Sequence, residues 1–498
     1  MSAIITEKFR QHNANQFVES FSEASASTYY LFLGKATGFT ASTTGGTDSS
    51  PPSPADSVKD EAFSWDSMLG AKLITSSDIK YSIPRRNWAN GTTYDMYEHD
   101  ISASNTTTSG ASNLYDSTFY FMTSDYRVYK VLDNNGGTAY SGSEPTSEST
   151  SLFSLGGYIL KYMYTISTSD FAKSGTTDFI PVTTDSTVSA AATDGSIQTL
   201  IVSGGSGYTD GTYYAAIYGD GTSQGTSSGA IVRITVSGGS IADFGLSAGT
   251  DTTINTAGAA YTYGYVNLGD DYIFSDSTLS TSTSLGSGSG GVISVITSPK
   301  GGHGFDAVKE LGGHYVMAAV TLTQAEGDDF TTANDFRSVG LVVDPYNYGT
   351  TTVATATTRR QTYVVKVDTN SGTFEADEVI TQASTGAVGK VVEWDSTLSL
   401  LYYQQESFKG FGTNSTTGSY VAFSGTNTIT GGSSGATGTT SGTTETITLV
   451  NNNTVTMTSG YANPELDPDS GNIIYLENRK PIQRASDQTE DIKIIIEF

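Results

Sequence analysis

The sequence predicts a mainly β, β-sandwich-like fold with few helices, divided into several domains. The chain of 498 residues contains 55 Gly, 30 Tyr and 21 Phe, and only 15% of its residues are charged. Aromatic and β-branched residues favour pleated, half-buried surfaces, whereas Gly, Ser, Asn and Asp favour turns. Short apolar runs therefore alternate with turn-forming runs. A chain of this length has room for two to four domains with real cores.

The first expected element is a helix over residues 3–24. Its large apolar residues recur near one helical face, with Glu and Gln on the other: Ile5, Phe9, Phe17 and Phe21. The low-complexity stretch from Thr37 to Pro54 follows, and it carries three prolines close together at Pro51, Pro52 and Pro54. Proline breaks helices, so we expect an extended connector here.

Residues 1–185 are predicted to form a core domain that begins with this helix. Two segments in it are strand-like, FYFMTSDYRVYKVL at 119–132 and YILKYMYTI at 158–166. In the first, the alternation and the aromatic content suit one half-buried antiparallel strand.

Two Gly/Ser/Thr-rich all-β insertions are expected within this core, over residues 186–291 and 351–460. In the first, strand-like runs at 199–203, 212–218 and 230–236 alternate with Gly-rich turns. The second contains an internal repeat, because VITQASTGAVGKV at 379–391 matches TITGGSSGATGTT at 428–440. Two copies of one β-unit are expected, since a solenoid usually needs at least three. Residues 292–350 and 461–498 return to the core, and the final run IKIIIEF predicts a terminal strand.

The charge balance and the absence of cysteine narrow the possible functions. The formal net charge is −26, from 25 basic and 51 acidic residues, and there is no Cys. A chain this acidic repels phosphate backbones and anionic membranes, so we expect no nucleic-acid partner. Without Cys, neither disulfides nor Cys-ligated metals can contribute to its stability. No signal peptide or apolar membrane span is recognisable, which predicts a cytoplasmic product without membrane insertion.

Several non-repetitive segments resemble, in order, one known family. They include IITEKFR at 4–10, PPSPADSV at 51–58, FSWDSMLGAKLI at 63–74, YSIPRRNW at 81–88, YRVYKVLDNN at 126–135, GGYILKYMYTI at 156–166, DFIPV at 178–182, NDFRSVGLVVDP at 334–345 and the tail from Ile473 to Phe498. These segments resemble the homodimeric baseplate wedge subunit of T-even-type contractile-tailed bacteriophages. The two Gly/Ser/Thr-rich modules fall outside the resemblance.

The resemblance implies a structural protein of the virion that is not an enzyme and needs no cofactor. It implies a homodimer, assembled in the host cytoplasm, that joins other wedge subunits to build the tail baseplate. It also implies a mostly β fold with a few helices, in agreement with the composition.

Two polar clusters are the candidate subunit interface. Arg85 and Arg86, followed by Trp88, combine bidentate donors with a large flat apolar group, which is typical of buried contacts between proteins. Glu477, Asn478 and Arg479, followed by the acidic run that starts at Asp487, form the second cluster beside apolar runs. The alternative for both clusters is an internal contact that fixes the fold of one monomer.

One stretch gathers metal-ligand residue types. His303 and His314 flank Asp306 and Glu310, which are four positions apart and suit one side of a short helical turn. A Zn or Fe site needs three or four ligands with ordered partners. We therefore expect a Gly-rich loop leading into a short capped helix, and neither a metal site nor catalytic residues.

Two other functions remain as alternatives to an assembly subunit. The β insertions could bind a host-surface glycan through the tyrosines that flank their loops, namely Tyr208, Tyr213, Tyr214, Tyr218, Tyr261 and Tyr263. An exposed row of these rings in a groove would favour glycan binding, and inward alternation would count against it. A glycan hydrolase would require a pair of carboxylates in a groove and a trimeric β-helix with many repeats, which two repeats do not provide.

Overall fold

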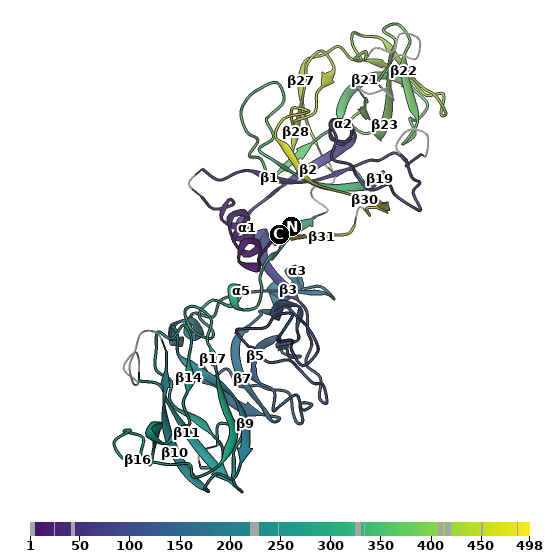
Figure 1. Cartoon of the computed structure of the whole chain (residues 1–498). Helices are drawn as coiled ribbons and strands as arrows, with labels where there is room; N and C mark the ends of the chain where they lie inside the picture. The colour runs from purple at the N-terminus through teal and green to yellow at the C-terminus, as the bar shows by residue number, and fades with distance from the viewer. Residues whose placement is uncertain are drawn as a thin grey trace. The chain divides into compact units, whose positions relative to one another are not determined.

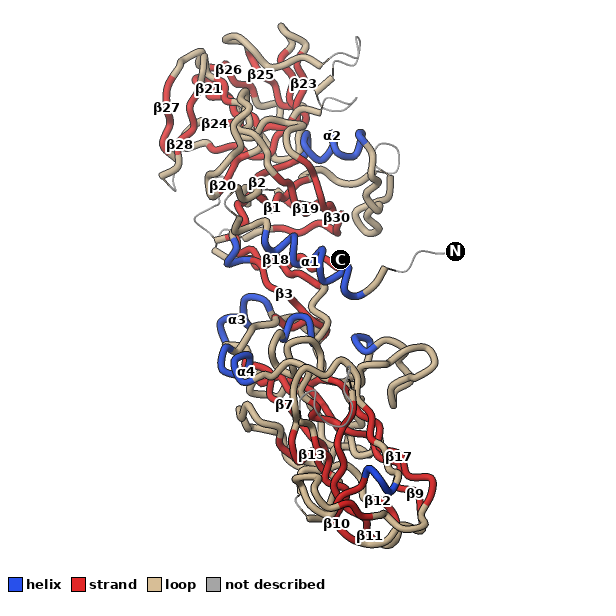
Figure 2. Tube along the Cα trace, turned by 60° about the vertical axis from the view of Figure 1, so that its left-hand side comes forward, coloured by secondary structure: helices blue, strands red, loops and turns tan. Residues whose placement is uncertain are grey.

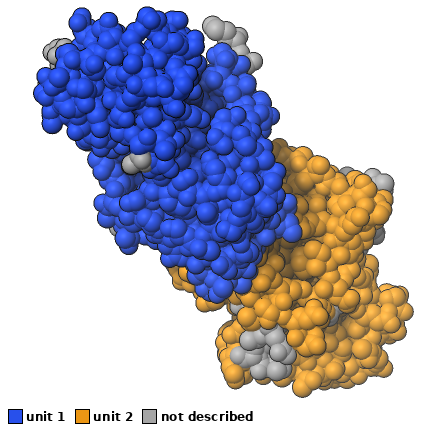
Figure 3. Space-filling view, turned by 90° about the horizontal axis from the view of Figure 1, so that it is seen from below, with its two compact units in different colours: residues 1–15, 80–317, 495–498 blue, residues 16–79, 318–494 orange. Residues whose placement is uncertain are grey.

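The computed structural model describes residues 5–498, apart from residues 24, 41–44, 220–228, 248, 324–329, 333, 407–411, 414–419, 450–451 and 486. The mainly β, multi-domain fold that the sequence predicts is confirmed, since strands outnumber helices throughout the described chain (Figure 2). The chain divides into two compact units, coloured separately in Figure 3. Unit 1 comprises residues 1–15, 80–317 and 495–498, and unit 2 comprises residues 16–79 and 318–494.

The frame of unit 1 is a small antiparallel sheet with the order β4-β5-β7-β6. Its strands are β4 (Tyr120–Met122), β5 (Arg127–Asp133), β6 (Phe153–Leu155) and β7 (Tyr158–Thr165). The expected single strand over 119–132 is wrong in one respect, because a turn at Thr123–Tyr126 folds it into the β4–β5 hairpin. Tyr126 adopts a φ of 63° in this turn. The alternation continues through the turn, so it gives no warning of the reversal.

The rest of the frame consists of short elements around this sheet. They are β3 (Ile79–Pro84), which pairs with β8 (Phe179–Pro181), the 3-10 turn η2 (Leu114–Asp116), and the helices α3 (Thr168–Ser174), α4 (Ser186–Ala191) and α5 (Ala307–Glu310). Asp185 and Asp306 cap α4 and α5 by accepting backbone N–H groups, which provides the partners that helix starts need. The predicted N-terminal helix is confirmed as α1 (Glu7–Glu19).

A larger sheet follows in unit 1, and it confirms the three strands expected between 199 and 236. Its main order is β12-β11-β10-β14-β17-β9, with β13, β15 and β16 paired at its side. The strands are β9 (Ile197–Ser206), β10 (Gly211–Tyr218), β11 (Ile231–Ser237), β12 (Ser240–Ile241), β13 (Thr253–Thr256), β14 (Tyr265–Val266), β15 (Ile273–Phe274), β16 (Ser282–Thr283) and β17 (Ser289–Thr297), with the 3-10 turn η3 (Asp270–Tyr272). Ile197 pairs with Thr297, so the two ends of this sheet segment lie side by side.

Unit 2 is built on a five-stranded antiparallel sheet with the order β20-β2-β1-β19-β30. These strands are β1 (Tyr29–Gly34), β2 (Met68–Ile74), β19 (Asp335–Val343), β20 (Thr358–Arg360) and β30 (Asn472–Gln483), accompanied by helix α2 (Val58–Ser67) and the 3-10 turn η1 (Ser76–Asp78). Tyr30, Phe32, Trp65 and Val342 form its core with almost no exposed surface. The division between the units falls within β18 (Tyr315–Leu322) and β31 (Glu490–Glu497), and β31 confirms the expected terminal strand.

The expected connector over Thr37–Pro54 contains no helix and no named strand in its described part. It is held to unit 2 by Asp48, whose two carboxylate oxygens each accept a hydrogen bond from the buried Arg337 at 3.0 Å. Hydrogen bonds from Arg337 lower the pKa of Asp48. The connector is therefore fixed in place despite its low-complexity sequence.

The internal repeat is confirmed as two matching hairpins in a seven-stranded sheet of unit 2. The strands of this sheet are β21 (Tyr363–Ser371), β22 (Val379–Gln382), β23 (Ala387–Asp395), β24 (Leu400–Gln404), β25 (Thr428–Gly431), β26 (Thr437–Thr440) and β29 (Tyr461–Ala462), and the hairpin β27 (Glu445–Thr448) and β28 (Thr454–Met457) follows β26 (Figure 1). β22 pairs with β25, and both strands alternate exposed and buried residues in the same order. Ile380 and Ile429 occupy equivalent positions and are both fully buried.

Candidate functional site: two polar clusters and a groove beside α2

The first predicted cluster, Arg85, Arg86 and Trp88, directly follows β3 in unit 1. Arg85 donates from Nε to Asn87 Oδ1 and from Nη1 to the carbonyl of Thr176, both at 2.9 Å. Its guanidinium carbon lies 5.2 Å from the centroid of the Phe171 ring. Both donor contacts lie within unit 1, so Arg85 joins the end of β3 to the segment before β8.

Arg86 and Trp88 continue this internal role. Arg86 donates to the carbonyl of Tyr115 at 2.8 Å, and its guanidinium carbon lies 4.3 Å from the centre of the buried Tyr120 ring. Such a cation–π contact is strengthened when both groups lose water. Trp88 packs edge-on against Tyr140 with ring centroids 5.8 Å apart. The geometry thus gives the cluster a role inside one monomer, and the half-buried side chains leave part of its surface open.

The second predicted cluster lies on β30 in unit 2. Glu477 accepts a hydrogen bond from Tyr475 at 2.8 Å and pairs with Arg479 at 3.1 Å. Asn478 uses both ends of its amide, since it accepts from Ser338 Oγ at 2.7 Å and donates to the carbonyl of Pro52 at 3.0 Å. Asn478 therefore fastens the connector to β30.

Asp487 lies apart from these residues, exposed in the turn between β30 and β31. Its neighbour in the same acidic run, Glu490, pairs instead with the buried Arg484 at 2.8 Å. The structure thus places the two predicted clusters in different units, and it separates Asp487 from Glu477 and Asn478.

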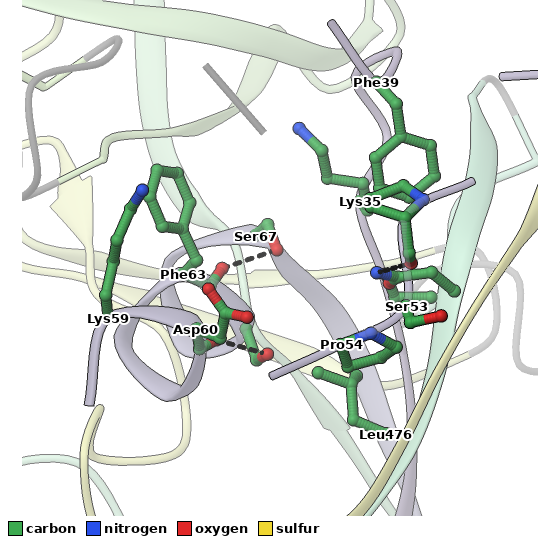
Figure 4. Close-up of a pocket in the computed structure, with 13 residues that line it drawn as sticks. Lys35, Phe39, Ser53, Pro54, Lys59, Asp60, Phe63, Ser67 and Leu476 are labelled. Atoms are coloured by element: carbon green, nitrogen blue, oxygen red, sulfur yellow. Dashed lines mark hydrogen bonds between the residues drawn. The ribbon is translucent and has the colours of Figure 1, made fainter. Parts of the chain in front are cut away.

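The structure forms a groove between α2 and β30 that no sequence pattern predicts. Figure 4 shows its narrow end, a pocket of about 90 Å³ with Lys59, Asp60 and Phe63 of α2 on one side and Lys35 and Phe39 on the other. A wider part of about 350 Å³ shares Pro54, Asp60, Ser64 and Leu476 with it and continues along 54–57 and 473–476. Asn478 belongs to the lining of the narrow end.

The wider part of this groove combines acidic and hydroxyl side chains with a smaller apolar part. Val58, at the start of α2, is 80% exposed, and Ile474, which lines the groove on β30, is 47% exposed. Asp56, Asp60 and Glu61 supply the carboxylates. Exposed apolar side chains surrounded by polar groups are characteristic of contact surfaces between proteins.

β30 is also the edge of its sheet in the described part of the chain. One side pairs with β19, and no described strand pairs with the other. Its register with β19 shifts at Ile474 and again over residues 479–481, where Lys480 and Pro481 lie. Bulges, Lys and Pro limit open-ended pairing of edge strands. These features therefore disfavour open-ended backbone pairing at the free edge of β30.

The stretch with metal-ligand residue types forms a buried ionic cluster. Lys130, with no exposed surface, donates to Glu310 Oε2 at 2.8 Å and to His303 Nδ1 at 3.0 Å. An ammonium group can only donate, so His303 Nδ1 accepts. Burial lowers the pKa of His303, and the charge of Lys130 lowers it further. Burial also lowers the pKa of Lys130, and Glu310 opposes this effect.

The other two residues of that stretch have separate roles. Asp306 caps α5, as expected for a short capped helix, and His314 Nδ1 lies 3.3 Å from Glu7 of α1. Among the described residues, no group of three or more His, Asp or Glu side chains is arranged to hold a metal ion. Sequence reasoning missed Lys130 because it lies far from His303 along the chain, in a run that otherwise predicts a strand.

The tyrosines named for glycan binding do not form an exposed row. Tyr213, Tyr218 and Tyr261 are buried, and Tyr208 hydroxyl accepts a hydrogen bond from the backbone of Gly291. Tyr263 is 51% exposed. Inward packing of most of these rings counts against the glycan alternative. Among the described residues, no helix is long and apolar enough to cross a membrane.

Comparisons with known proteins point to one family. The family model described as bacteriophage T4 Gp8 matches residues 3–143 and 445–498, the two ends of the chain. A search of curated proteins finds no match. The matched segments contain β1, β2, α2 and β30 of unit 2 and the β4–β5 hairpin of unit 1, whereas residues 144–444 lie outside the match. The two matched segments support the assignment of the chain as a T4-type baseplate wedge subunit, a structural protein of the phage tail.

Proposed function

We propose that the protein acts as a homodimeric assembly subunit that joins other wedge subunits, without enzymatic activity or a cofactor. One observation carries the proposal: the α2–β30 groove is lined entirely by segments that match the Gp8 family, except for Ser338 at its narrow end. The groove offers exposed apolar residues, an acidic border and the edge strand of a sheet. It therefore supplies what a contact between subunits needs.

We assign the groove to a contact between subunits. Its apolar contacts are Ile474 in its lining and the exposed Val58, which follows the lining residue Ser57. Asn478 supports the contact by holding the connector against β30, and Glu477 and Arg479 border it. A stable contact should bury on the order of 1,200–2,000 Å² in total. The groove is thus the centre of a larger surface. Assembly would take place in the host cytoplasm, before the subunit becomes part of the virion.

The first experiment is the mass of the purified protein in solution, measured by light scattering alone and then with the other wedge subunits. The proposal predicts a dimer that enters a larger complex only when those subunits are present. A monomer that ignores the other subunits would contradict both the dimer and the wedge contact.

The groove is tested with the double variant Val58→Asp and Ile474→Asp. Both side chains are exposed, and an acidic residue in the first turn of α2 suits the helix dipole, so the fold should tolerate the change. The variant should lose either the dimer or the wedge complex. The control is Val379→Asp, which also replaces an exposed apolar side chain by an acidic one, but on β22 and outside the matched segments. Unchanged assembly of the double variant would reject the groove as a contact.

Glycan binding by the β insertions remains as a second candidate. Tyr263 and Tyr265 are both about half exposed, and Tyr265 stacks on Tyr218 with ring centroids 5.6 Å apart. Retention of the protein on a polysaccharide column, abolished by Tyr263→Ala and Tyr265→Ala, would support it.

A further inference from the structure

The largest cavity among those described lies in unit 1, beside α1, and no function considered so far uses it. It has a volume of about 690 Å³ and is formed by one face of α1, the loop at 97–101, the turn η2, the loop at 299–300 and α5. All of the residues that line it belong to unit 1. We refer to it as the α1 cavity.

Four basic side chains in the described part of its wall are unpaired. Lys8 and His12 lie one turn apart on α1, and His99 and Lys300 lie on the two loops. None of these four has a hydrogen-bond or ion-pair partner among the described residues. The chain as a whole carries a net charge of −26, so such a concentration of free basic side chains stands out from its surroundings.

The carboxylates of the same wall are already paired. Glu310 is bound to Lys130 and also accepts the backbone N–H of Gly304 at 2.8 Å. Asp306 caps α5 and pairs with Lys309 at 2.7 Å. Desolvation raises the pKa of the remaining carboxyl group, Glu98. An incoming anion would meet the unpaired ammonium groups of Lys8 and Lys300 in this wall.

α1 presents three different faces, as expected from 3.6 residues per turn. One face contacts the body of unit 1 through Glu7, which accepts from Asn113 at 3.1 Å, and Arg10, which pairs with Glu497 at 2.6 Å. A second face, with Lys8 and His12, lines the cavity. Beside it, Phe9 is 55% exposed, and Ile5, just before the helix, is 60% exposed.

This arrangement corrects one expectation from the sequence. Ile5, Phe9, Phe17 and Phe21 were expected near one helical face, but only the last two pack into an aromatic group, with Tyr29. Ile5 and Phe9 remain exposed and are not among the residues that line the α1 cavity. Exposed apolar residues next to basic ones favour a peptide with both acidic and apolar side chains over a simple inorganic anion.

We infer that the α1 cavity is a docking site for an acidic, partly apolar segment of another protein chain. Its carboxylates meet Lys8, Lys300 and the two histidines, and its apolar side chains cover Ile5 and Phe9. The inference rests on the proposed function in one respect only, namely that the other protein chain is another baseplate subunit. The α1 cavity is separate from the α2–β30 groove, which has an acidic border and belongs to unit 2.

The test uses the full-length protein and a short fluorescent peptide that alternates Glu and Leu. Fluorescence anisotropy at low salt should show saturable binding that weakens as salt is added, because screening reduces attraction between exposed charges. A peptide with Gln in place of Glu should not bind. The double variant Lys8→Glu and Lys300→Glu should bind the Glu peptide at least about tenfold more weakly. Lys173→Glu, an equal charge change on α3 outside the cavity, should bind as the unchanged protein does.

Three outcomes would overturn the inference. They are no peptide binding at low salt, equal binding by the double variant, and binding of inorganic phosphate without binding of the peptide. Salt-sensitive self-association that the double variant loses would also overturn it, since the occupant would then be a second copy. A protein that dimerises and joins the wedge but does not bind the peptide refutes the cavity assignment alone. A protein that binds the peptide but never joins the wedge refutes the proposed function alone.

Discussion

The two Gly/Ser/Thr-rich sheets have similar compositions but depend on the rest of the chain in different ways. In unit 1, buried residues of the sheet at 197–297 belong to the same hydrophobic cluster as Phe119, Leu132 and Met163 of the frame. In unit 2, a cluster of buried residues of the sheet at 363–462 lies wholly between Val365 and Ala436. Composition therefore identifies such a module. Whether the module can be removed without unfolding the rest depends on whether its buried residues pack against the frame or against one another.

Both sheets begin and end at neighbouring positions, which is the geometry of an insertion. Ile197 pairs with Thr297 in the first, and Val364 pairs with Ala462 in the second. We therefore propose that both are modules inserted into the frame, near the boundaries expected from the sequence. The second depends on the frame less, although Gln404 donates a buried hydrogen bond to the carbonyl of Met68 and Asn334 donates one to the carbonyl of Val392.

Removal of each module should give the largest difference in thermal unfolding between the two sheets. A chain that lacks residues 363–462, with Thr362 joined to Asn463 by a short Gly-Ser linker, should keep a cooperative thermal unfolding transition. A chain that lacks residues 197–297 should lose the transition of unit 1, because its frame would expose part of a shared core to water. Calorimetry of the two shortened chains checks this. If both chains unfold cooperatively, the shared core of unit 1 is not essential and the comparison fails.

The buried ion pair of Lys130 and Glu310 tests how far the core of unit 1 depends on contacts between its segments. Lys130→Met removes the partner of Glu310 in a site without water-exposed surface, so it should destabilise unit 1 by about 3–5 kcal/mol. The double variant Lys130→Met and Glu310→Gln should recover part of this loss, since no unpaired charge remains. Denaturant unfolding followed by tryptophan fluorescence measures both. Equal stability of the single variant and the unchanged protein would show that the pair contributes nothing.

Asp133, at the end of β5, should make the stability of unit 1 depend on pH. Burial raises its pKa to about 6, above the unfolded value of about 3.9, and Asp243 adds to the shift. The protonated form is therefore favoured in the folded state, and stability falls as the pH rises from about 4 through 6.

Asp133→Asn should remove this loss and stabilise unit 1 by about 1–3 kcal/mol at pH 7.5, with little effect at pH 4. Asn retains the oxygen that accepts from the backbone of Asn135 at 2.8 Å. Denaturant midpoints at the two pH values test the sign. A variant that is less stable at pH 7.5 would contradict it.

Substitutions in the repeat of unit 2 should have the smallest effect on stability. Ile380→Val and Ile429→Val each remove one methylene from equivalent, fully buried positions, so each should cost about 0.5–1.5 kcal/mol. The two losses should agree within about 0.5 kcal/mol if the hairpins contribute equally. Val379→Ala, at an exposed position of the same hairpin, serves as the control. Clearly unequal losses would mean that the two hairpins are similar in sequence but are not packed equally well.

Local patterns predicted much of the fold, since the helix near the N-terminus, the strands at 158–166 and 199–236, the repeated hairpins and the final strand all follow from periodicity and turn residues. Patterns failed where long-range contacts decide the outcome. The turn at Thr123–Tyr126 interrupts a continuous alternation, and Asp48 fastens the connector through Arg337, which lies far away in sequence.

The candidate site shows the same limit. Asn478 was identified from its polar neighbourhood, but its hydrogen bond to Pro52 could not be foreseen from spacing. The α2–β30 groove combines residues 52–67 with residues 473–478, two segments that the sequence marks separately but does not bring together. Which residues face each other across a sheet depends on strand order, and one sequence does not specify that order.

The most direct test of the account is sedimentation of the chain without residues 363–462, mixed with the other wedge subunits. The account holds that assembly depends on the frame, which keeps the α2–β30 groove, and not on the module, of which only residues 445–462 lie in the family match. It predicts that the shortened chain dimerises and enters the wedge complex as the full chain does. A folded shortened chain that remains outside the complex would contradict it, and would assign assembly to the module.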